Sequence, residues 1–429
     1  MIRRIIVAGG GTGGHLFPGI AVVEELRRRL PDAEVTFVGT AKGIEARVLP
    51  ERGERLELID VAPLKGRSAA ELMRSLMMLP GACSQAFGII GAVKPDVVIG
   101  VGGYASGPML LAAAARGVPT AILEQNAHVG LTNRVLAPLA GRAYVAWEEA
   151  ADQIGRRRAK LLGNPVRRAF VDASRAAMAD PDGFEARSRR ILILGGSQGA
   201  KVLNETVPAA LAGLDLASRG IDVLHQTGAA MRSEVEARYR ELGVPAEVVT
   251  FVDDMAKAYA SASLVIARAG ATTLAELCAI GRPAILVPYP FAADDHQAKN
   301  AEALERAGAA IAMREAKLTS EGLAAAVRDL LEDPSRRARM AEAARVHGRP
   351  DAAAAIVDDL FAWLGGPSAS VAPPEPRSSK DEGGGGARFA SVDFRAGRAI
   401  SAIPPRRSTL PPPPIYLEVL PATARTLAD

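Results

Sequence analysis

The clearest alternation of apolar and polar stretches lies at residues 263–308. Two short apolar runs, 264–267 and 284–287, are each followed by a longer stretch of helical character. Runs of this length rich in β-branched and aliphatic residues predict buried strands, and the longer stretches predict helices. Strand, loop and helix repeated in this order predict a parallel α/β unit.

The same alternation continues along most of the chain. In the first half it predicts strands at 3–8, 35–39, 97–101 and 120–124 and a helix at 18–30; in the second half it predicts strands at 191–194, 222–226 and 248–251. Strand, glycine-rich loop and helix occur twice in like form, at 3–30 and again from 189 onward. The repetition predicts two similar α/β domains.

Composition shifts set the expected boundaries. The GNPVR sequence at 163–167 is expected to cross between domains, because Asn-Pro favours an extended turn. We therefore expect an N-terminal domain at 1–163, a C-terminal domain at 164–345 and a C-terminal helix within 346–365. Residues 366–429 contain runs of pure glycine and pure proline and predict a disordered tail without catalytic residues.

Composition narrows the functional classes. The 429 residues are 48% apolar and carry a formal net charge of +4, which is too small to argue for nucleic-acid binding. The two cysteines, Cys83 and Cys278, have no metal-ligand spacing, so a reducing cytosol is the expected setting. The apolar run at 5–8 is too short for a signal peptide, and the uncharged stretch 97–115 contains glycines and a proline that favour strand, loop and helix over a membrane span.

The loop at 268–273, RAGATT, joins a predicted strand to a helix whose first N–H groups have no partner within the helix. Such helix N-termini bind anions, above all phosphates. Thr273 and Glu276 also fit a capping box, in which the helix start satisfies itself. A second helix start at 294–297 belongs to the same α/β unit, and the pair suits a nucleotide diphosphate at the carboxyl edge of the sheet.

Gly9, Gly11 and Gly14 match the G-x-G-x-x-G pattern of dinucleotide-binding loops, so an oxidoreductase is one alternative. A nicotinamide site requires an acidic residue after the second strand for the ribose, and the sequence GTAK at 39–42 has none. The loop also lacks the Gly-Lys-Ser/Thr ending of a P-loop.

Seven ordered motifs together resemble the MurG family of N-acetylglucosaminyltransferases, over about residues 1–364: GGGTGGHLFPG, GVGGYASGP, EQNAHVGLTN, GNPVR, GGSQGA, RAGATTLAEL and DDHQAKNA. The resemblance implies the GT-B architecture, in which two Rossmann-like domains with parallel sheets face each other across a cleft. It implies inverting, metal-independent transfer of N-acetylglucosamine from UDP-N-acetylglucosamine to the C4 hydroxyl of N-acetylmuramoyl(pentapeptide)-diphospho-undecaprenol, lipid I. The product, lipid II, is used in peptidoglycan synthesis.

The resemblance also implies a setting. The enzyme would act as a peripheral protein at the cytoplasmic face of the bacterial inner membrane, without a cofactor, on an anionic membrane surface. Proteins of cell-wall synthesis and cell division are candidate partners, and nucleic acid is not.

The donor contacts implied by the matching motifs come from both domains. They are Thr12, Gly13, Gly14, Asn126, Arg167, Ser197, Val252, Ala271, Thr272, Thr273, Leu274, Ala275, Glu276 and Gln297. On physical grounds Thr272 and Thr273 would hold the diphosphate, and Glu276 would accept both ribose hydroxyls. The motifs depart from the family pattern at Leu123, Ala267, Ala269 and Asp295, none of which is an implied donor ligand.

Inverting transfer needs a general base near the acceptor hydroxyl. His15, at a helix start that favours neutral imidazole, is the candidate, although it could instead hydrogen-bond the glycine loop or a phosphate. Glu124 is the second candidate, although it could equally brace Asn126 or Arg134. Tyr104 and Asn133 are expected on the acceptor side.

Two further segments have more than one interpretation. Residues 72–79, LMRSLMML, place apolar side chains near Lys65, Arg67 and Arg74; the segment could be core or an interfacial membrane anchor. The DPD sequence at 180–182 spells the metal-binding D-x-D of other glycosyltransferases, but it lies in a polar connector, and no metal site is expected.

Two other functions share these loops. A UDP-N-acetylglucosamine 2-epimerase would have the same two-domain fold and UDP site, but it needs more acidic residues in the cleft and no membrane surface. A non-catalytic nucleotide-sensing module would need only one of the two half-sites.

Overall fold

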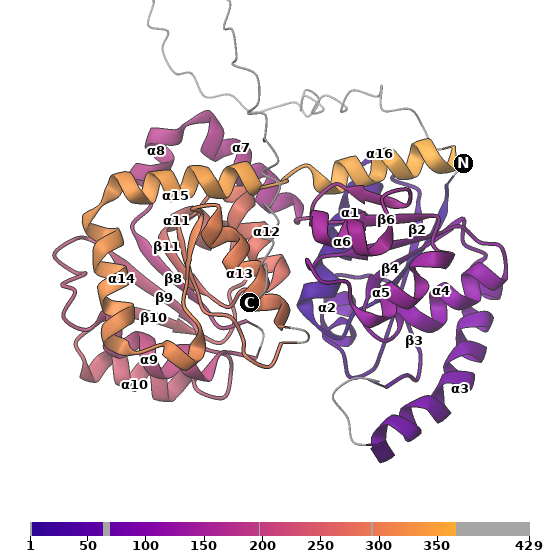
Figure 1. The fold of residues 1–429 in the computed structure, drawn as a ribbon, viewed down its shortest axis with the longest axis horizontal. Coiled ribbons are helices and arrows are strands. Elements are labelled where there is room, and N and C mark those ends of the chain that lie inside the picture. The colour runs from indigo at the N-terminus through magenta and orange to yellow at the C-terminus, as the bar shows by residue number, and fades with distance from the viewer. Residues whose placement is uncertain (1, 63–68, 197, 293–294, 366–429) are drawn as a thin grey trace, which may run out of the picture. The chain divides into compact units, whose positions relative to one another are not determined.

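The computed structural model describes residues 2–62, 69–196, 198–292 and 295–365. Residues 366–429, for which a disordered tail is predicted, lie outside this part of the chain. Two parallel α/β domains make up the described residues (Figure 1). The α/β prediction is confirmed.

The N-terminal domain is built on a seven-stranded parallel sheet of order β3-β2-β1-β4-β5-β6-β7. Its strands are β1 (Arg4–Gly9), β2 (Glu34–Gly39), β3 (Leu56–Leu58), β4 (Val97–Gly102), β5 (Thr120–Glu124), β6 (Arg142–Val145) and β7 (Ala159–Leu161). Its helices are α1 (Gly13–Arg29), α2 (Glu45–Glu51), α3 (Ala69–Val93), α4 (Ser106–Ala115), α5 (Leu131–Leu136), the 3₁₀ turn η1 (Ala137–Leu139) and α6 (Glu148–Ile154).

The C-terminal domain has a six-stranded parallel sheet of order β10-β9-β8-β11-β12-β13. Its strands are β8 (Arg190–Leu194), β9 (Asp222–Gln226), β10 (Ala246–Val249), β11 (Ala262–Ala267), β12 (Ala284–Leu286) and β13 (Ala310–Ala312). Its helices are α7 (Arg168–Ala179), α8 (Pro181–Ala186), α9 (Lys201–Leu211), α10 (Arg232–Glu241), α11 (Met255–Ser261), α12 (Ala271–Ile280), α13 (His296–Arg306), the 3₁₀ turn η3 (Glu315–Lys317), α14 (Ser320–Glu332) and α15 (Pro334–His347). The last helix of the described chain is α16 (Ala352–Leu364).

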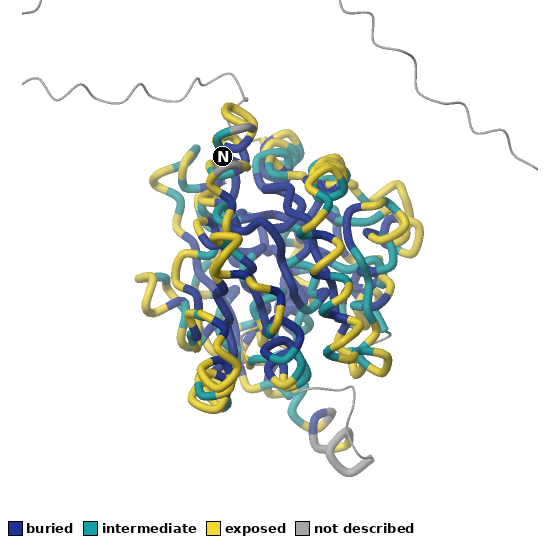
Figure 2. Tube along the Cα trace, turned by 90° about the vertical axis from the view of Figure 1, so that its left-hand side faces the viewer, coloured by how far each residue is buried: buried dark blue, intermediate teal, exposed yellow. Residues whose placement is uncertain are grey.

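Both sheets are buried on their two faces, which is why the central strands read as continuous apolar runs and not as alternating ones. In β1, Ile5 and Val7 pack on one face, and Ile6 and Ala8 pack on the other. The same division separates Ile191 and Ile193 of β8 from Leu192 and Leu194. Buried residues accordingly concentrate along the strands (Figure 2).

Helix α1 begins five residues earlier than predicted, at Gly13 instead of Pro18. A proline inside a helix removes one backbone donor, so the carbonyl four residues earlier loses its partner. Here that carbonyl belongs to Gly14, and it accepts a hydrogen bond from the Thr272 hydroxyl of the other domain at 3.2 Å. The proline therefore leaves open an acceptor that α12 uses.

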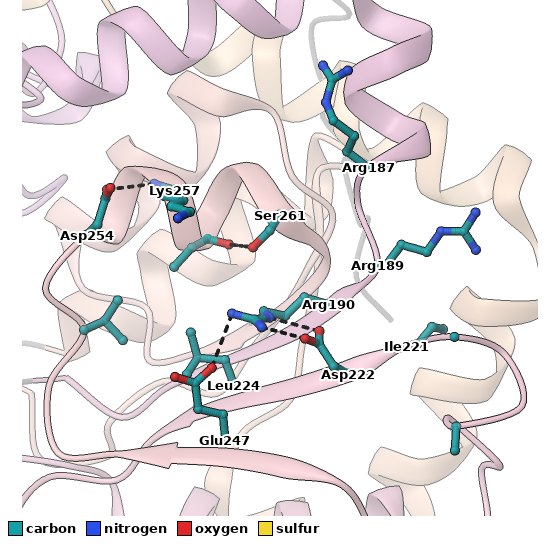
Figure 3. Close-up of a pocket in the computed structure, with 14 residues that line it drawn as sticks. Arg187, Arg189, Arg190, Ile221, Asp222, Leu224, Glu247, Asp254, Lys257 and Ser261 are labelled. Carbon is teal, nitrogen blue, oxygen red and sulfur yellow. Dashed lines mark hydrogen bonds and ion pairs between the residues drawn. The ribbon is translucent and has the colours of Figure 1, made fainter.

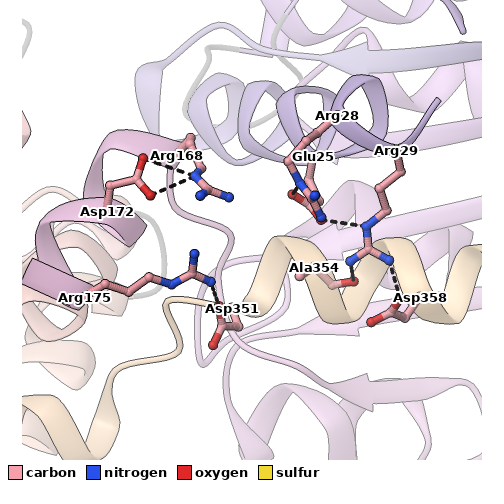
Figure 4. Close-up of polar contacts among 9 residues, drawn as sticks. All are labelled: Glu25, Arg28, Arg29, Arg168, Asp172, Arg175, Asp351, Ala354 and Asp358. Carbon is pink, nitrogen blue, oxygen red and sulfur yellow. Dashed lines mark hydrogen bonds and ion pairs between the residues drawn. The ribbon is translucent and has the colours of Figure 1, made fainter. Parts of the chain in front are cut away.

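Helix α16 belongs structurally to the N-terminal domain, although it follows the C-terminal one in sequence. Ile356 and Leu360 lie in the same core cluster as Ile5 of β1. Asp358 pairs with Arg29 of α1, and Ala354 accepts a second hydrogen bond from Arg29 at 3.3 Å (Figure 4). The chain therefore crosses back after α15.

His225 of β9 is fully buried and shares a hydrogen bond of 2.9 Å with the Tyr239 hydroxyl. Burial lowers its pKa from 6.5 to about 3, so the imidazole is neutral in the folded protein. The unfolded chain takes up a proton below about pH 6.5, and the folded chain does so only near pH 3. The stabilising effect of keeping His225 neutral and buried is therefore complete above pH 6.5, and it is lost as the pH falls below that value.

We expect His225 to reduce the free energy of unfolding by about 2 kcal/mol between pH 7 and pH 5. Urea unfolding at the two pH values should show a smaller loss in the double variant His225→Phe with Tyr239→Phe, which removes both hydrogen-bonding groups. Replacing the exposed His347 with Gln is the control. An equal loss in the double variant and the native chain would contradict the assignment.

Candidate active site

The first glycine loop lies against the carboxyl end of β4. Gly9, Gly10 and Gly11 have φ values of +134°, +141° and +85°, which side chains rarely adopt. Gly10 N–H donates to the Gly102 carbonyl at 3.2 Å. A Cβ on Gly9 would collide with that same carbonyl, so the close approach of the two loops depends on glycine.

A buried carboxylate that the sequence analysis did not identify holds this loop. Glu45 of α2 accepts a hydrogen bond from Gly11 N–H at 2.7 Å and one from Thr40 N–H at 2.9 Å. A nicotinamide site would place an acidic residue for the ribose directly after β2. The carboxylate comes instead from the next helix, and both its oxygens bind backbone amides and not a ribose.

His15 lies in the first turn of α1, with its imidazole packed over Gly102. Its Nδ1 is 3.2 Å from Oε1 of Gln125, which is buried and follows β5. Gln125 Nε2 in turn donates to the Val101 carbonyl of β4 at 3.0 Å. The structure thus places the candidate base where the ends of β1, β4 and β5 meet.

Glu124, the second candidate base, is buried at the end of β5 with both oxygens engaged. Oε1 accepts from Asn126 N–H at 3.1 Å and from its side-chain amide at 3.3 Å. Oε2 accepts from Gly130 N–H and from the Asn133 amide, each at 3.0 Å. This geometry fits the alternative in which Glu124 braces Asn126; Arg134 instead donates to the Val129 carbonyl.

The two residues expected on the acceptor side differ in exposure. Asn133 is buried, and its amide nitrogen also donates to the Leu123 carbonyl at 2.9 Å, so it holds the loop that follows β5. Tyr104 follows the glycines after β4, and its side chain is 41% exposed. Of the two, Tyr104 alone offers an accessible group.

In the C-terminal domain, the capping-box interpretation of α12 is wrong. The N-cap is Gly270, which has no side chain to cap the helix, and Thr273 lies within the first turn. The small residues at 269–271 let the helix begin before Thr273, which leaves the first amide groups without a side-chain acceptor. Among the side chains of this turn, the Thr272 hydroxyl contacts the first glycine loop at Gly14.

Glu276 lies one turn further along α12 and is only 4% exposed. Its Oε1 accepts a hydrogen bond from Arg167 Nη2 at 2.7 Å. Burial raises the pKa of Glu276, and the Arg167 guanidinium opposes that shift. The guanidinium also stacks on Phe17 of α1 and Phe170 of α7, 4.7 and 5.0 Å from the ring centroids.

The other residues implied as donor contacts are placed differently. Leu274 is buried in the core, and Ala275 packs against it, so they offer backbone only. Gln297 Oε1 accepts from Tyr289 N–H at 3.0 Å, which ties α13 to the loop after β12. Val252 is buried after β10, and Ser197 lies outside the described residues.

A hollow of ≈ 680 Å³ lies elsewhere, and its lining includes the residues that begin β8 and β9 (Figure 3). Arg190 is held there between Asp222 and Glu247 at 2.5 and 3.6 Å. Ligands of parallel α/β sheets bind at the opposite edge, where the strands end. Of the implied donor contacts that the structure describes, only Val252 lines this hollow.

The first aspartate of the D-x-D segment caps a helix. Asp180 is the N-cap of α8, accepting from Gly183 N–H at 3.0 Å, and it pairs with Arg187. Within the described part of the chain, no three His, Cys, Asp or Glu side chains group so that they could hold a metal ion.

Comparison with known families covers both domains. Residues 5–145 match the glycosyltransferase family 28 N-terminal domain, and residues 190–356 match the glycosyltransferase family 28 C-terminal domain. The first match ends with β6, and the second begins with β8, covers the whole second sheet and reaches into α16.

Two relatives carry the name UDP-N-acetylglucosamine–N-acetylmuramyl-(pentapeptide) pyrophosphoryl-undecaprenol N-acetylglucosamine transferase. The one from Anaeromyxobacter sp. (strain K) is 50% identical over 356 residues, covering 83% of this chain and 91% of its own. The one from Myxococcus xanthus (strain DK1622) is 46% identical over 370 residues, covering 86% and 95%.

Two solved structures are similar to this chain. MurG of Acinetobacter baumannii aligns with a TM-score of 0.65 and 32% identity, covering 84% of this chain and 99% of that one. A UDP-N-acetylglucosamine 2-epimerase aligns with a TM-score of 0.57 at 14% identity, covering 86% and 99%, which shows a shared fold alone. The chain therefore belongs to the MurG family of glycosyltransferases, and it has the two-domain GT-B architecture of that family.

Proposed function

We propose that this protein transfers N-acetylglucosamine from UDP-N-acetylglucosamine to the C4 hydroxyl of lipid I, giving lipid II for peptidoglycan synthesis. The names of relatives at 46–50% identity support the donor and the acceptor. The observation that carries the proposal is the contact of Thr272 with Gly14, which brings the uncapped N-terminus of α12 to the first glycine loop. A donor held by one domain would there meet an acceptor held by the other.

The donor diphosphate would bind at the N-terminus of α12. The unpaired amides of its first turn and the Thr273 hydroxyl supply hydrogen-bond donors at the positive end of the helix dipole. The Thr272 hydroxyl donates its one proton to the Gly14 carbonyl, so Thr272 would contribute its backbone amide here. The same groups would stabilise the negative charge that grows on departing UDP. Arg167 would add a cation on this side.

The acceptor step would use His15. The C4 hydroxyl oxygen attacks the anomeric carbon, its proton passes to His15, and the bond from that carbon to the diphosphate oxygen breaks. UDP leaves with the electron pair, and the anomeric centre is inverted. Glu124 would act through the loop that it braces and not as the base.

Purified protein with UDP-N-acetylglucosamine and a short-chain lipid I analogue tests this function. UDP release should require the analogue, and a disaccharide product should appear. An epimerase would instead consume the sugar nucleotide without acceptor, and that result would overturn the proposal.

The proposed ribose contact at Glu276 leads to a prediction about affinity. Glu276→Gln should weaken UDP binding about 10- to 100-fold in calorimetry, because hydrogen bonds to a carboxylate contribute about 1.5–3 kcal/mol. Arg167 would lose its ion-pair partner in the same variant. Glu302→Gln, on α13, is the matched control; equal affinity in both variants would remove Glu276 from the donor site.

The lipid-linked acceptor requires docking at a bilayer, for which we propose the surface of α3 and α5. None of the helices within the described ranges is long and apolar enough to cross a membrane. On α3, Met73 and Met77 are 61% and 70% exposed. Leu131 and Val135 are exposed at successive turns of α5, and α4 packs against both helices.

Basic residues are predicted to flank this surface. Lys65 and Arg67 lie outside the described residues, as does the side chain of Arg74. Exposed apolar side chains would enter the interface of the cytoplasmic leaflet, and nearby cations would attract anionic headgroups.

Replacing Met73 and Met77 with Gln should lower binding to phosphatidylglycerol vesicles several-fold in sedimentation, while turnover of a soluble acceptor analogue stays unchanged. The apolar area available for burial is smaller in this variant. Met178→Gln is the control, because Met178 is 58% exposed on α7 of the other domain. Unchanged vesicle binding would contradict the α3 surface.

A further inference from the structure

Gln125 connects the candidate base to the sheet beneath it. It directly follows β5, its side chain is 2% exposed, and its backbone carbonyl accepts from Trp147 Nε1 at 3.2 Å. Its side chain lies between His15 Nδ1, at 3.2 Å, and the Val101 carbonyl, at 3.0 Å. The glutamine is therefore held from both the backbone and the side chain.

The orientation of the Gln125 amide follows from its two neighbours. A backbone carbonyl can only accept a hydrogen bond, so the Val101 carbonyl requires Nε2 on its side. The reverse orientation would place two oxygens against each other. Oε1 therefore points to His15, and it too can only accept.

The imidazole lies against the Gly102 backbone on the side of this acceptor. A Cβ at Gly102, which has a φ of +93°, would lie 2.8 Å from His15 Nδ1, so the ring packs directly on the Gly102 backbone. Within the described residues, no hydrogen bond is formed at the other ring nitrogen, Nε2.

We propose that Gln125 is a positioning residue that holds neutral His15 with its proton on Nδ1 and its lone pair on Nε2. The amide oxygen accepts the Nδ1 proton, so Nε2 is the nitrogen available to a substrate hydroxyl. A neutral amide does this without the charge that would stabilise imidazolium. The catalytic consequence rests on the proposed function, whereas the tautomer does not.

The charged groups on the neighbouring elements are engaged in bonds of their own. Glu45 of α2 binds Gly11 and Thr40 N–H groups, and Glu124 of β5 accepts four hydrogen bonds. Arg167, which stacks on Phe17 of α1, pairs with Glu276. Tyr104 follows Gly103 in the loop after β4. All of these remain when Gln125 alone is replaced, so their effects cancel in the comparison.

The tautomer can be observed without any turnover. The chain has five histidines, and long-range ¹H–¹⁵N spectra of protein labelled at histidine, compared with His15→Ala, identify the His15 signals. Above pH 7 the native protein should show a protonated Nδ1 and an unprotonated Nε2. Gln125→Met, which has similar length but only a weak sulfur acceptor, should shift His15 toward the Nε2–H form. A native His15 protonated at Nε2 would overturn the proposal.

The pH profile distinguishes positioning from packing. Gln125→Glu keeps the shape, gives up the hydrogen bond to the Val101 carbonyl and places an anion beside Nδ1, which favours imidazolium. The acidic limb of kcat/KM for a lipid I analogue should therefore move upward by about one pH unit. Gln153 is an exposed residue of α6 whose Nε2 also donates to a backbone carbonyl, that of Ala127. Gln153→Glu therefore makes the same chemical change and should leave the limb in place.

Gln125→Met should lower kcat at least about tenfold while KM for UDP-N-acetylglucosamine stays constant, because the basic nitrogen is then misdirected for part of the time. An acidic limb that does not move in Gln125→Glu would contradict positioning. If the Nδ1–H tautomer is found but His15→Ala retains turnover, the base assignment fails and the role of Gln125 in fixing the ring stands.

Discussion

Replacing His15 with Ala should lower kcat by about 10²- to 10⁴-fold, the range that a positioned general base contributes. UDP affinity should change little, because the donor groups proposed at α12 are untouched. Initial rates of UDP release with a lipid I analogue, together with calorimetry of UDP binding, measure the two effects separately.

His15→Gln is the informative companion to this variant. A glutamine can fill much of the space of the imidazole and still hydrogen-bond, but it cannot take up a proton near neutral pH. It should therefore be as slow as His15→Ala while keeping the glycine loop packed. Equal losses of turnover and UDP binding in both variants would instead mean that His15 organises the loop or contacts a phosphate.

The largest expected loss of stability is at Arg282, a fully buried arginine that follows α12. Its guanidinium donates to the carbonyls of Tyr259 and Ala260 at 3.0 and 2.6 Å, at the C-terminal end of α11. It also pairs with Glu185 at 3.1 Å and stacks on Phe184. Burial lowers the pKa of Arg282 to about 10, which still leaves it charged at neutral pH.

Arg282→Met should lower the free energy of unfolding by about 3 kcal/mol, because it removes charged donors from buried carbonyls and leaves the shape similar. The unfolding transition of the C-terminal domain in urea measures this loss. Arg156→Met is the control, since Arg156 is exposed and pairs with the exposed Asp152, so the stability of this variant should not change. A comparable loss in the two variants would show that Arg282 has no special role.

The sequence predicted the central strands well, because a parallel strand covered on both faces must be apolar throughout. It did so less well at the edges: β3 and β7 have three residues each and include charged ones, so no apolar run marks them. The strand predicted at 248–251 lies at Ala246–Val249, because Glu247 pairs with Leu224 of β9 despite its charge.

The residues of the candidate site also divide into those that the local sequence predicts and those that it does not. Ordered glycine loops and helix starts can be read from the chain, because they depend on small residues at defined positions. Glu45 and Gln125 could not be assigned from local pattern. Their roles arise only when α2 and β5 bring them to a loop that lies 34 and 110 residues away.

What the sequence by itself determined is the two α/β domains, their glycine loops and the family, since each follows from local periodicity and motif order. The tertiary structure alone decided that Glu276 pairs with Arg167, that Glu124 braces its loop and that Gln125 faces His15. The physical reason is that burial and hydrogen-bond geometry depend on partners distant in sequence. The residue type states only what a side chain can donate or accept.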